Sequence, residues 1–135
     1  MSRFVFYDLQ NVHIYVNLMM RAIVFYRTAR GTSPVEEFLN SLNSKQAQKV
    51  VWVLRLIEEL PQIPTQYFKK LDGTSGLWEV RIQMGSDAIR LLGFFDGGRL
   101  VVLTNGFAKK TQKTPARELL LAEQRKRDYV LRRGS

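Results

Sequence analysis

The chain has no cysteine and a single histidine, His13. Without cysteine it forms no disulfide, has no thiolate nucleophile and lacks the main ligand of structural zinc sites. One histidine is too few for a metal site built from imidazoles, and too few for a ribonuclease mechanism that needs two histidines. We therefore expect a protein without a metal ion or another cofactor.

Several common functional signatures are also missing. There is no P-loop, no GxSxG or HExxH motif and no glycine pattern for binding a dinucleotide. The most apolar region is interrupted by polar residues such as Asp8, Asn11 and Asn17, so no run is long enough for a transmembrane helix. The chain shows no signal-peptide pattern. We expect a cytoplasmic protein that has no membrane partner.

Negative charge is scarce. The chain has 21 Lys and Arg residues against 12 Asp and Glu, a formal net charge of +9. From Thr104 onward there are 9 basic and 3 acidic residues, so most of the excess lies near the C-terminal end. Solubility alone does not require such clustering, whereas binding to nucleic acid or to an acidic protein favours it. The charge therefore predicts an anionic partner.

The pattern of apolar residues predicts an α+β fold in the order β-α-α-β-β-β-α. The expected elements cover residues 21–28, 33–42, 43–60, 77–84, 89–95, 99–107 and 114–133. Ser33, Ser44 and Thr114 are the expected N-caps of the three helices, and Pro34 and Pro115 suit the first turns of the first and last helix. We expect an antiparallel sheet of about four strands with the helices packed on it.

The second expected helix and the N-terminal residues complete this description. The helix places Ala47, Val50, Val51, Leu54 and Ile57 on one face at helical spacing, which predicts that they lie in the core. Residues 20–135 are expected to form a single domain. Residues 1–19 form an N-terminal extension to which the sequence assigns no role.

Cationic side chains cluster around the three later strands. They are Lys69 and Lys70 before the first of these strands, Arg81 and Arg90 on either side of a turn, and Lys109 and Lys110 after the last. A single Arg on a strand is usually solvated or paired, so the joint pattern is what points to a phosphodiester. Glu79 is more simply read as the ion-pair partner of Arg81 or Arg90 than as a catalyst, and Trp78 as a core residue.

The block from Lys69 to Tyr129 resembles the HigB-type branch of the RelE/ParE toxin superfamily. The resemblance lies in the motifs "LWEVR", an Arg that opens the next strand, "GFAKKTQKTP" and a closing helix that ends in "DY". The apolar strand and helix pair from about residue 21 to 60 agree with it, whereas residues 1–19 lie outside it. The motif "KKTQKTP" is the most specific part.

The resemblance implies the toxin of a type II toxin–antitoxin pair, an mRNA interferase that acts on the translating ribosome. In this family the ribose 2′-OH attacks its own phosphate without a metal ion. The implied partners are the ribosome, mRNA and a helix-turn-helix antitoxin of the HigA type. Cations would then stabilise the charge on the phosphate, a role that suits the planar fork of Arg.

The resemblance also implies roles for individual residues. Arg81, Arg90, Lys109 and Lys110 would bind the phosphate and stabilise the transition state, and Lys69, Lys70, Lys113 and Arg117 would hold the RNA backbone. For proton transfer the candidates are Glu79 as a base, Tyr129 or a Lys with a lowered pKa as an acid, and a base supplied by the ribosome.

Two other functions are compatible with the same fold, because function depends on the site and not on the scaffold. One is a noncatalytic inhibitor of DNA gyrase, as in the ParE branch, and the other is a basic nucleic-acid-binding module. Both predict tolerance to Arg→Lys changes in the site, whereas catalysis through bidentate phosphate contacts does not.

Overall fold

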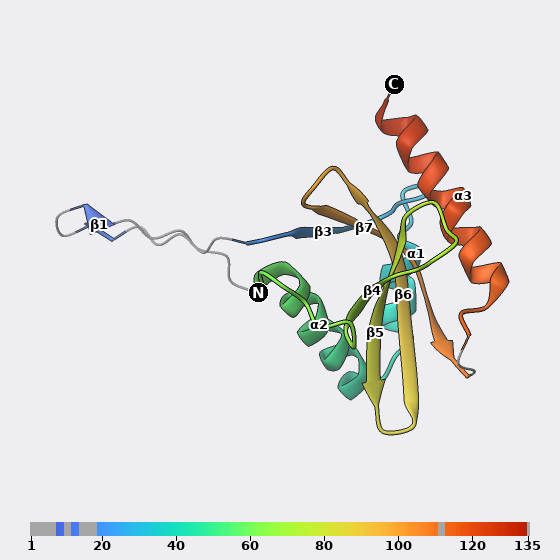
Figure 1. Cartoon of the computed structure of the whole chain (residues 1–135), viewed down its shortest axis with the longest axis horizontal. Coiled ribbons are helices and arrows are strands. Elements are labelled where there is room, and N and C mark those ends of the chain that lie inside the picture. Colours follow the sequence, from blue (N-terminus) through green and yellow to red (C-terminus); the bar gives the residue numbers. More distant parts are fainter. Residues whose placement is uncertain (1–7, 10–11, 14–18, 111–112, 135) are drawn as a thin grey trace.

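The computed structural model describes residues 8–9, 12–13, 19–110 and 113–134 (Figure 1). Its elements are β1 (Asp8–Leu9), β2 (Val12–His13), β3 (Ala22–Phe25), α1 (Pro34–Asn40), α2 (Ser44–Glu59), β4 (Phe68–Lys70), β5 (Leu77–Met84), β6 (Asp87–Asp96), β7 (Leu100–Lys109) and α3 (Ala116–Arg133). Strands β1 and β2 pair with each other. Most of the expected N-terminal extension lies outside the described residues, so its separation from the domain stays a prediction.

The other five strands form one mixed sheet in the order β3-β7-β6-β5-β4. The α+β class is confirmed, but two details of the expected sheet are wrong. Strand β3 pairs parallel to β7, because α1 and α2 carry the chain across the sheet before it returns. Strand β4, expected as a loop, adds a fifth strand beside β5; its three residues are too few to show a period.

The helix starts follow local capping chemistry. The Ser33 hydroxyl accepts a hydrogen bond from the Glu36 amide at 3.1 Å, which confirms the expected cap of α1. For α2 the expected cap is wrong by one residue, since Asn43 takes the place of Ser44. Asn43 and Gln46 form a reciprocal capping box, which satisfies two otherwise unpaired donors.

The sheet separates two apolar cores. We call its two sides the α1/α2 face and the α3 face, and Figure 1 shows α2 and α3 on opposite sides of the sheet. On the α1/α2 face, the core contribution of α2 comes from Val50, Val53, Leu54 and Ile57. Val51, expected in this core, is 41% exposed, because the buried stripe of α2 is rotated toward Val53.

A β-bulge in β7 changes which residues face α3. Leu92 pairs with Asn105 and Gly93 with Leu103, so Thr104 is the extra residue. Before the bulge Leu103 packs on the α1/α2 face, whereas after it Phe107 packs on the α3 face. Without the extra residue strict alternation would place both on one face. The bulge therefore turns the last residues of β7, Lys109 included, toward the α3 face.

Candidate active site

Four cations on four neighbouring strands lie on the α3 face. Arg81 and Arg90 are direct cross-strand partners, and Lys69 pairs with Glu79, two residues before Arg81. Arg90 also pairs with Phe107, and Lys109 lies two residues further along β7 on the same side. We call Lys69, Arg81, Arg90 and Lys109 the cationic cluster. Three of its members were expected as catalytic residues and Lys69 as an RNA-binding residue.

The carboxylate of Glu79 lies at the centre of the cluster. Its Oε1 lies 3.5 Å from Nε of Arg81 and 3.7 Å from Nε of Arg90, and its side chain is 3% exposed. Two Arg residues directly opposite each other repel, so the carboxylate supplies the counter-charge that this pairing needs. The carboxylate is thus buried and paired with both Arg residues.

Arg90 is the most deeply buried cation of the cluster. Its Nη1 donates to the carbonyl oxygens of Ile89 at 2.9 Å and Ile82 at 3.3 Å. Its Nε has no hydrogen-bond partner among the described residues, although Glu79 lies within ion-pair distance. Burial lowers the pKa of Arg90, Glu79 opposes this and Arg81 adds to it. The guanidinium is thus fixed in place but incompletely satisfied.

Burial and the other charges of the cluster change the pKa of Lys109. Burial lowers the pKa of Lys109, and the charges of Arg90, Arg81 and Lys69 lower it further, against the opposing effect of Glu79. Lys109 therefore gives up its proton more readily than an exposed lysine does.

The remaining expected cations lie outside this cluster. Lys70 pairs with Trp78 and so lies on the other face of β4, while Lys110 is exposed just beyond the end of β7. Lys113 lies three residues before Ala116, the first residue of α3. Arg117 in the first turn of α3 is 89% exposed and lies 3.7 Å from the adjacent Glu118. Lys113 is the chain neighbour of Thr114, whose hydroxyl donates to Glu79.

Tyr129 lies far from the cationic cluster. Its hydroxyl donates to Oδ2 of Asp96 at 2.8 Å, and its ring packs edge-on against Phe94 at 5.5 Å. Asp96 ends the strand in which Arg90 lies near the beginning. The structure therefore does not bring Tyr129 together with the other expected site residues.

Thr114 has a role that differs from the expected one. Its hydroxyl donates to Oε2 of Glu79 at 2.7 Å, and among the described residues no side chain caps α3. The expected N-cap is therefore wrong: the hydroxyl reaches across to β5. A Thr-Pro pair before a helix carries no sign of such a distant partner.

The bulge is held to α3 by buried polar groups that the sequence reading missed. The Asn105 amide donates to the Glu118 carboxylate at 3.0 Å, and Arg125 donates to the Thr104 carbonyl oxygen at 3.0 Å. Asn105 and Thr104 are buried. The Asn105–Gly106 pair within an apolar strand was the available signal, since a Gly inside a strand indicates a bulge or a close backbone approach.

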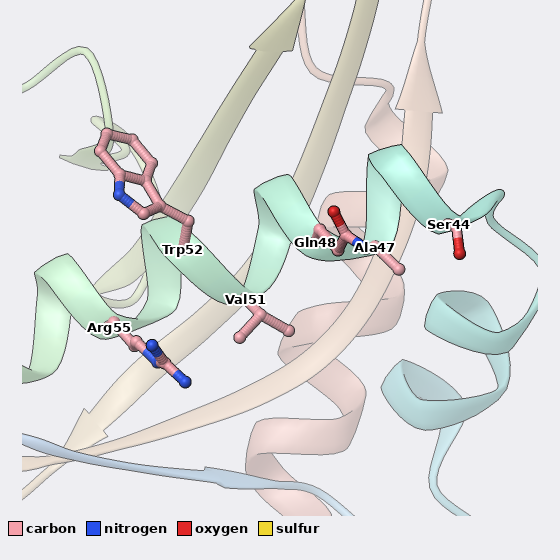
Figure 2. A pocket seen from close by; sticks show the side chains of 6 residues that line it. All are labelled: Ser44, Ala47, Gln48, Val51, Trp52 and Arg55. Atoms are coloured by element: carbon pink, nitrogen blue, oxygen red, sulfur yellow. The ribbon is translucent and has the colours of Figure 1, made fainter. Parts of the chain in front are cut away.

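The outer surface of α2 has a shallow hollow of about 480 Å³ (Figure 2). It is lined by Ser44, Ala47, Gln48, Val51, Trp52 and Arg55. Arg55 is its only ionisable residue, so the hollow has no acid–base pair. It also lies on the side of the sheet away from the cationic cluster, and it is not the candidate site.

The described residues offer little for two other kinds of function. No group of three or more His, Cys, Asp or Glu side chains among them is placed to hold a metal ion. Across the same part of the chain, no helix combines the length and apolar character that crossing a membrane requires.

The fold and the cluster define a small basic α+β protein in which four neighbouring strands gather cations on one face of the sheet. The sequence pattern of the phage-derived Gp49-like protein family (DUF891) matches residues 37–127, about two thirds of the chain. The chain belongs to this family, a RelE-like toxin family of toxin–antitoxin systems, and membership implies an antitoxin partner. None of the curated proteins compared with the chain matches it.

Proposed function

We propose that the protein is a HigB-type toxin that cuts translated mRNA on the ribosome. The observation that carries this proposal is the cationic cluster: four positive side chains from four strands surround one buried carboxylate. A phosphodiester that gains charge in its transition state is the natural ligand of such a site. Without a metal ion, the cations supply the electrostatic stabilisation.

The proposed reaction is an internal transesterification of RNA. The 2′-oxygen loses its proton and forms a bond to phosphorus, while the bond between phosphorus and the 5′-oxygen breaks. The products are a 2′,3′-cyclic phosphate and a free 5′-OH, so no water is consumed in this step. Arg81 and Arg90 stabilise the charge on the nonbridging oxygens, with the fork geometry that phosphate favours.

Lys109 is the proposed general acid. The 5′-oxygen needs a proton as it leaves, and an ammonium group with a lowered pKa is a better donor at neutral pH than an ordinary lysine. Glu79 is held by two Arg residues and Thr114, which supports a structural role in place of that of a base. In our proposal the ribosome supplies the base and positions the 2′-OH, which makes cleavage depend on the ribosome.

The surrounding cations hold the RNA backbone in this proposal. Lys69 lies within the cluster, Lys113 and Arg117 lie just before and in the first turn of α3, and Lys70 and Lys110 extend the positive charge to the sheet edge and the end of β7. A helix-turn-helix antitoxin of the HigA type is the proposed inhibitor, and the cytoplasm, where translation takes place, is the proposed location. The positive charge favours fast association with an acidic partner surface.

Primer extension on a reporter mRNA in a purified translation system tests the function. We expect discrete cuts that need ribosomes and that disappear in Arg81→Ala and Lys109→Ala. Intact mRNA combined with arrested growth would contradict the proposal and favour a protein target such as gyrase. Intact mRNA without toxicity would leave a nucleic-acid-binding module or an inactive toxin.

A further inference from the structure

We infer that Thr114 is a positioning residue, whose hydrogen bond to Glu79 fixes the start of α3 against the cationic cluster. This inference rests on the proposed function, because it concerns how the same site is held in a cleaving geometry. Thr114 touches no reacting atom in this scheme and acts through Glu79, Lys113 and Arg117.

The first argument is the helix cap that α3 lacks. A Thr before a helix ordinarily accepts a hydrogen bond from an amide of the first turn and so stabilises the helix locally. Thr114 instead donates to Glu79, which is 35 residues away in sequence. Ser33 makes the ordinary local bond at the start of α1. The link to Glu79 therefore replaces local helix stabilisation with a connection to the site.

The second argument is that the two oxygens of the Glu79 carboxylate have different partners. Oε1 faces the two guanidinium groups of Arg81 and Arg90, whereas Oε2 accepts the Thr114 hydroxyl. The side chain is 3% exposed, so water has little access to take over a lost bond. Without the hydroxyl, the carboxylate is free to turn Oε2 toward a guanidinium, because an unsatisfied buried acceptor is costly. Thr114 thus sets the direction from which both Arg residues are held.

The third argument is what lies next to Thr114 along the chain. Lys113 precedes it directly and Arg117 lies in the first turn of α3, so both proposed RNA-holding cations move with it. The Asn105 amide ties Glu118 of the same turn to β7. The first turn of α3 is therefore fixed at two points, one to the bulge and one to the centre of the cluster.

Three variants separate positioning from stability. Thr114→Val keeps the shape of the side chain but removes the hydroxyl, Thr114→Ser keeps the hydroxyl, and Ser33→Ala removes a hydrogen bond at a helix outside the site. We measure cleavage by each variant over a range of concentrations of stalled ribosome–mRNA complex, which gives kcat and KM separately. Thermal unfolding of each variant is measured alongside.

For Thr114→Val we expect kcat/KM to fall about tenfold, with a lower kcat, as for loss of a hydrogen bond to a charged group. Thr114→Ser should restore kcat/KM to within about twofold, because a hydroxyl again reaches Glu79. Ser33→Ala should unfold at a lower temperature but cleave normally. Equal kcat/KM values for wild type and Thr114→Val, or equal losses in the Val and Ser variants, would overturn the inference.

Hydrogen exchange gives a readout that does not depend on cleavage. The amides of Glu118 and Leu119 donate to the Pro115 carbonyl oxygen at 3.0 and 3.2 Å, and they report on the first turn of α3. Their exchange should become faster in Thr114→Val and stay unchanged in Thr114→Ser. If wild type cuts no mRNA, the proposed function fails, while faster exchange in the Val variant still supports the anchor. Unchanged exchange in the Val variant overturns the anchor, whatever the cleavage result.

Discussion

The two faces of the sheet carry the same strands but do different work. On the α1/α2 face, helices cover an uninterrupted apolar layer that includes Ile82 and Leu91. On the α3 face a single helix covers Leu77, Leu92 and Phe94, and the same face also holds Glu79 and the cationic cluster. Both faces therefore stabilise the fold through apolar packing, and this packing offsets the charge repulsion that only the α3 face carries.

The largest effect is expected from a substitution in the apolar core of the α1/α2 face. Leu91 is fully buried, so Leu91→Ala should lower the free energy of unfolding by about 2–5 kcal/mol, through lost burial and a remaining cavity. Urea unfolding measures the loss. Cleavage per folded molecule should stay unchanged at a temperature where the variant is folded. A specific loss of cleavage would show that the two faces are not separable.

The next largest effect is expected from a substitution in the cationic cluster of the α3 face that keeps the positive charge. Arg81→Lys should lower kcat/KM for ribosome-bound mRNA by about 10²-fold, because an ammonium replaces the planar fork. Arg55→Lys, on the outer surface of α2, is the matched control and should cleave as wild type does (Figure 2). Full activity of Arg81→Lys would point to the noncatalytic alternatives, for which positive charge suffices.

A smaller effect is expected from a substitution at the bulge, which tests whether the bulge determines the face on which Lys109 lies. Asn105→Ala removes the amide that donates to Glu118, so it should lower the free energy of unfolding by about 1–3 kcal/mol. It should also lower cleavage, since the bulge directs Lys109. Phe107→Leu, a conservative change two residues further along β7, should affect stability with a smaller loss of cleavage. Wild-type cleavage by Asn105→Ala would show that the bulge keeps its shape without this contact.

Tyr129→Phe tests the part of the α3 face that lies away from the cluster. Losing the hydrogen bond to Asp96 should lower the free energy of unfolding by about 1 kcal/mol. Cleavage should not change, since Tyr129 lies near the other end of β6. A tenfold loss of kcat with an intact fold would instead assign Tyr129 to proton transfer.

The smallest expected effect is a dependence of stability on alkaline pH. The pKa of Lys109 is lowered in the folded state, so the unfolded chain binds this proton more tightly. Stability should therefore rise with pH in the window between the lowered pKa and that of an exposed lysine. Urea unfolding at several alkaline pH values should show this rise in wild type relative to Lys109→Met. Parallel curves for the two proteins would contradict the lowered pKa.

Local patterns predicted the parts of this structure that depend on neighbours in sequence. The Ser33–Pro34 helix start is local chemistry, and the turn after Met84 does place Arg81 opposite Arg90. The ion pairs of Glu79 with both Arg residues agree with its interpretation as a structural partner. Each of these follows from spacing within a single helix or hairpin.

The features that the sequence did not reveal depend on contacts between distant segments. Parallel pairing of β3 with β7 joins residues almost 80 positions apart. From its sequence neighbours Thr114 is expected to cap the helix, because they give no sign of the hydrogen bond to the distant Glu79. The extra residue Thr104 decides on which side of the sheet Lys109 lies. Strict alternation along the strand would place Lys109 on the opposite side.

The bulge at Thr104 also has a consequence for how this strand tolerates change. It divides β7 into two segments that differ in register with β6. Substitutions before Thr104 alter packing in the cores, whereas substitutions near Lys109 alter the charged surface. Thr104 is itself uncharged, so its deletion would leave the net charge of +9 intact while rotating the strand end by half a period. A deletion at this point thus alters the surface while the numbers of basic and acidic residues stay the same, a route to inactive copies that net charge would not reveal.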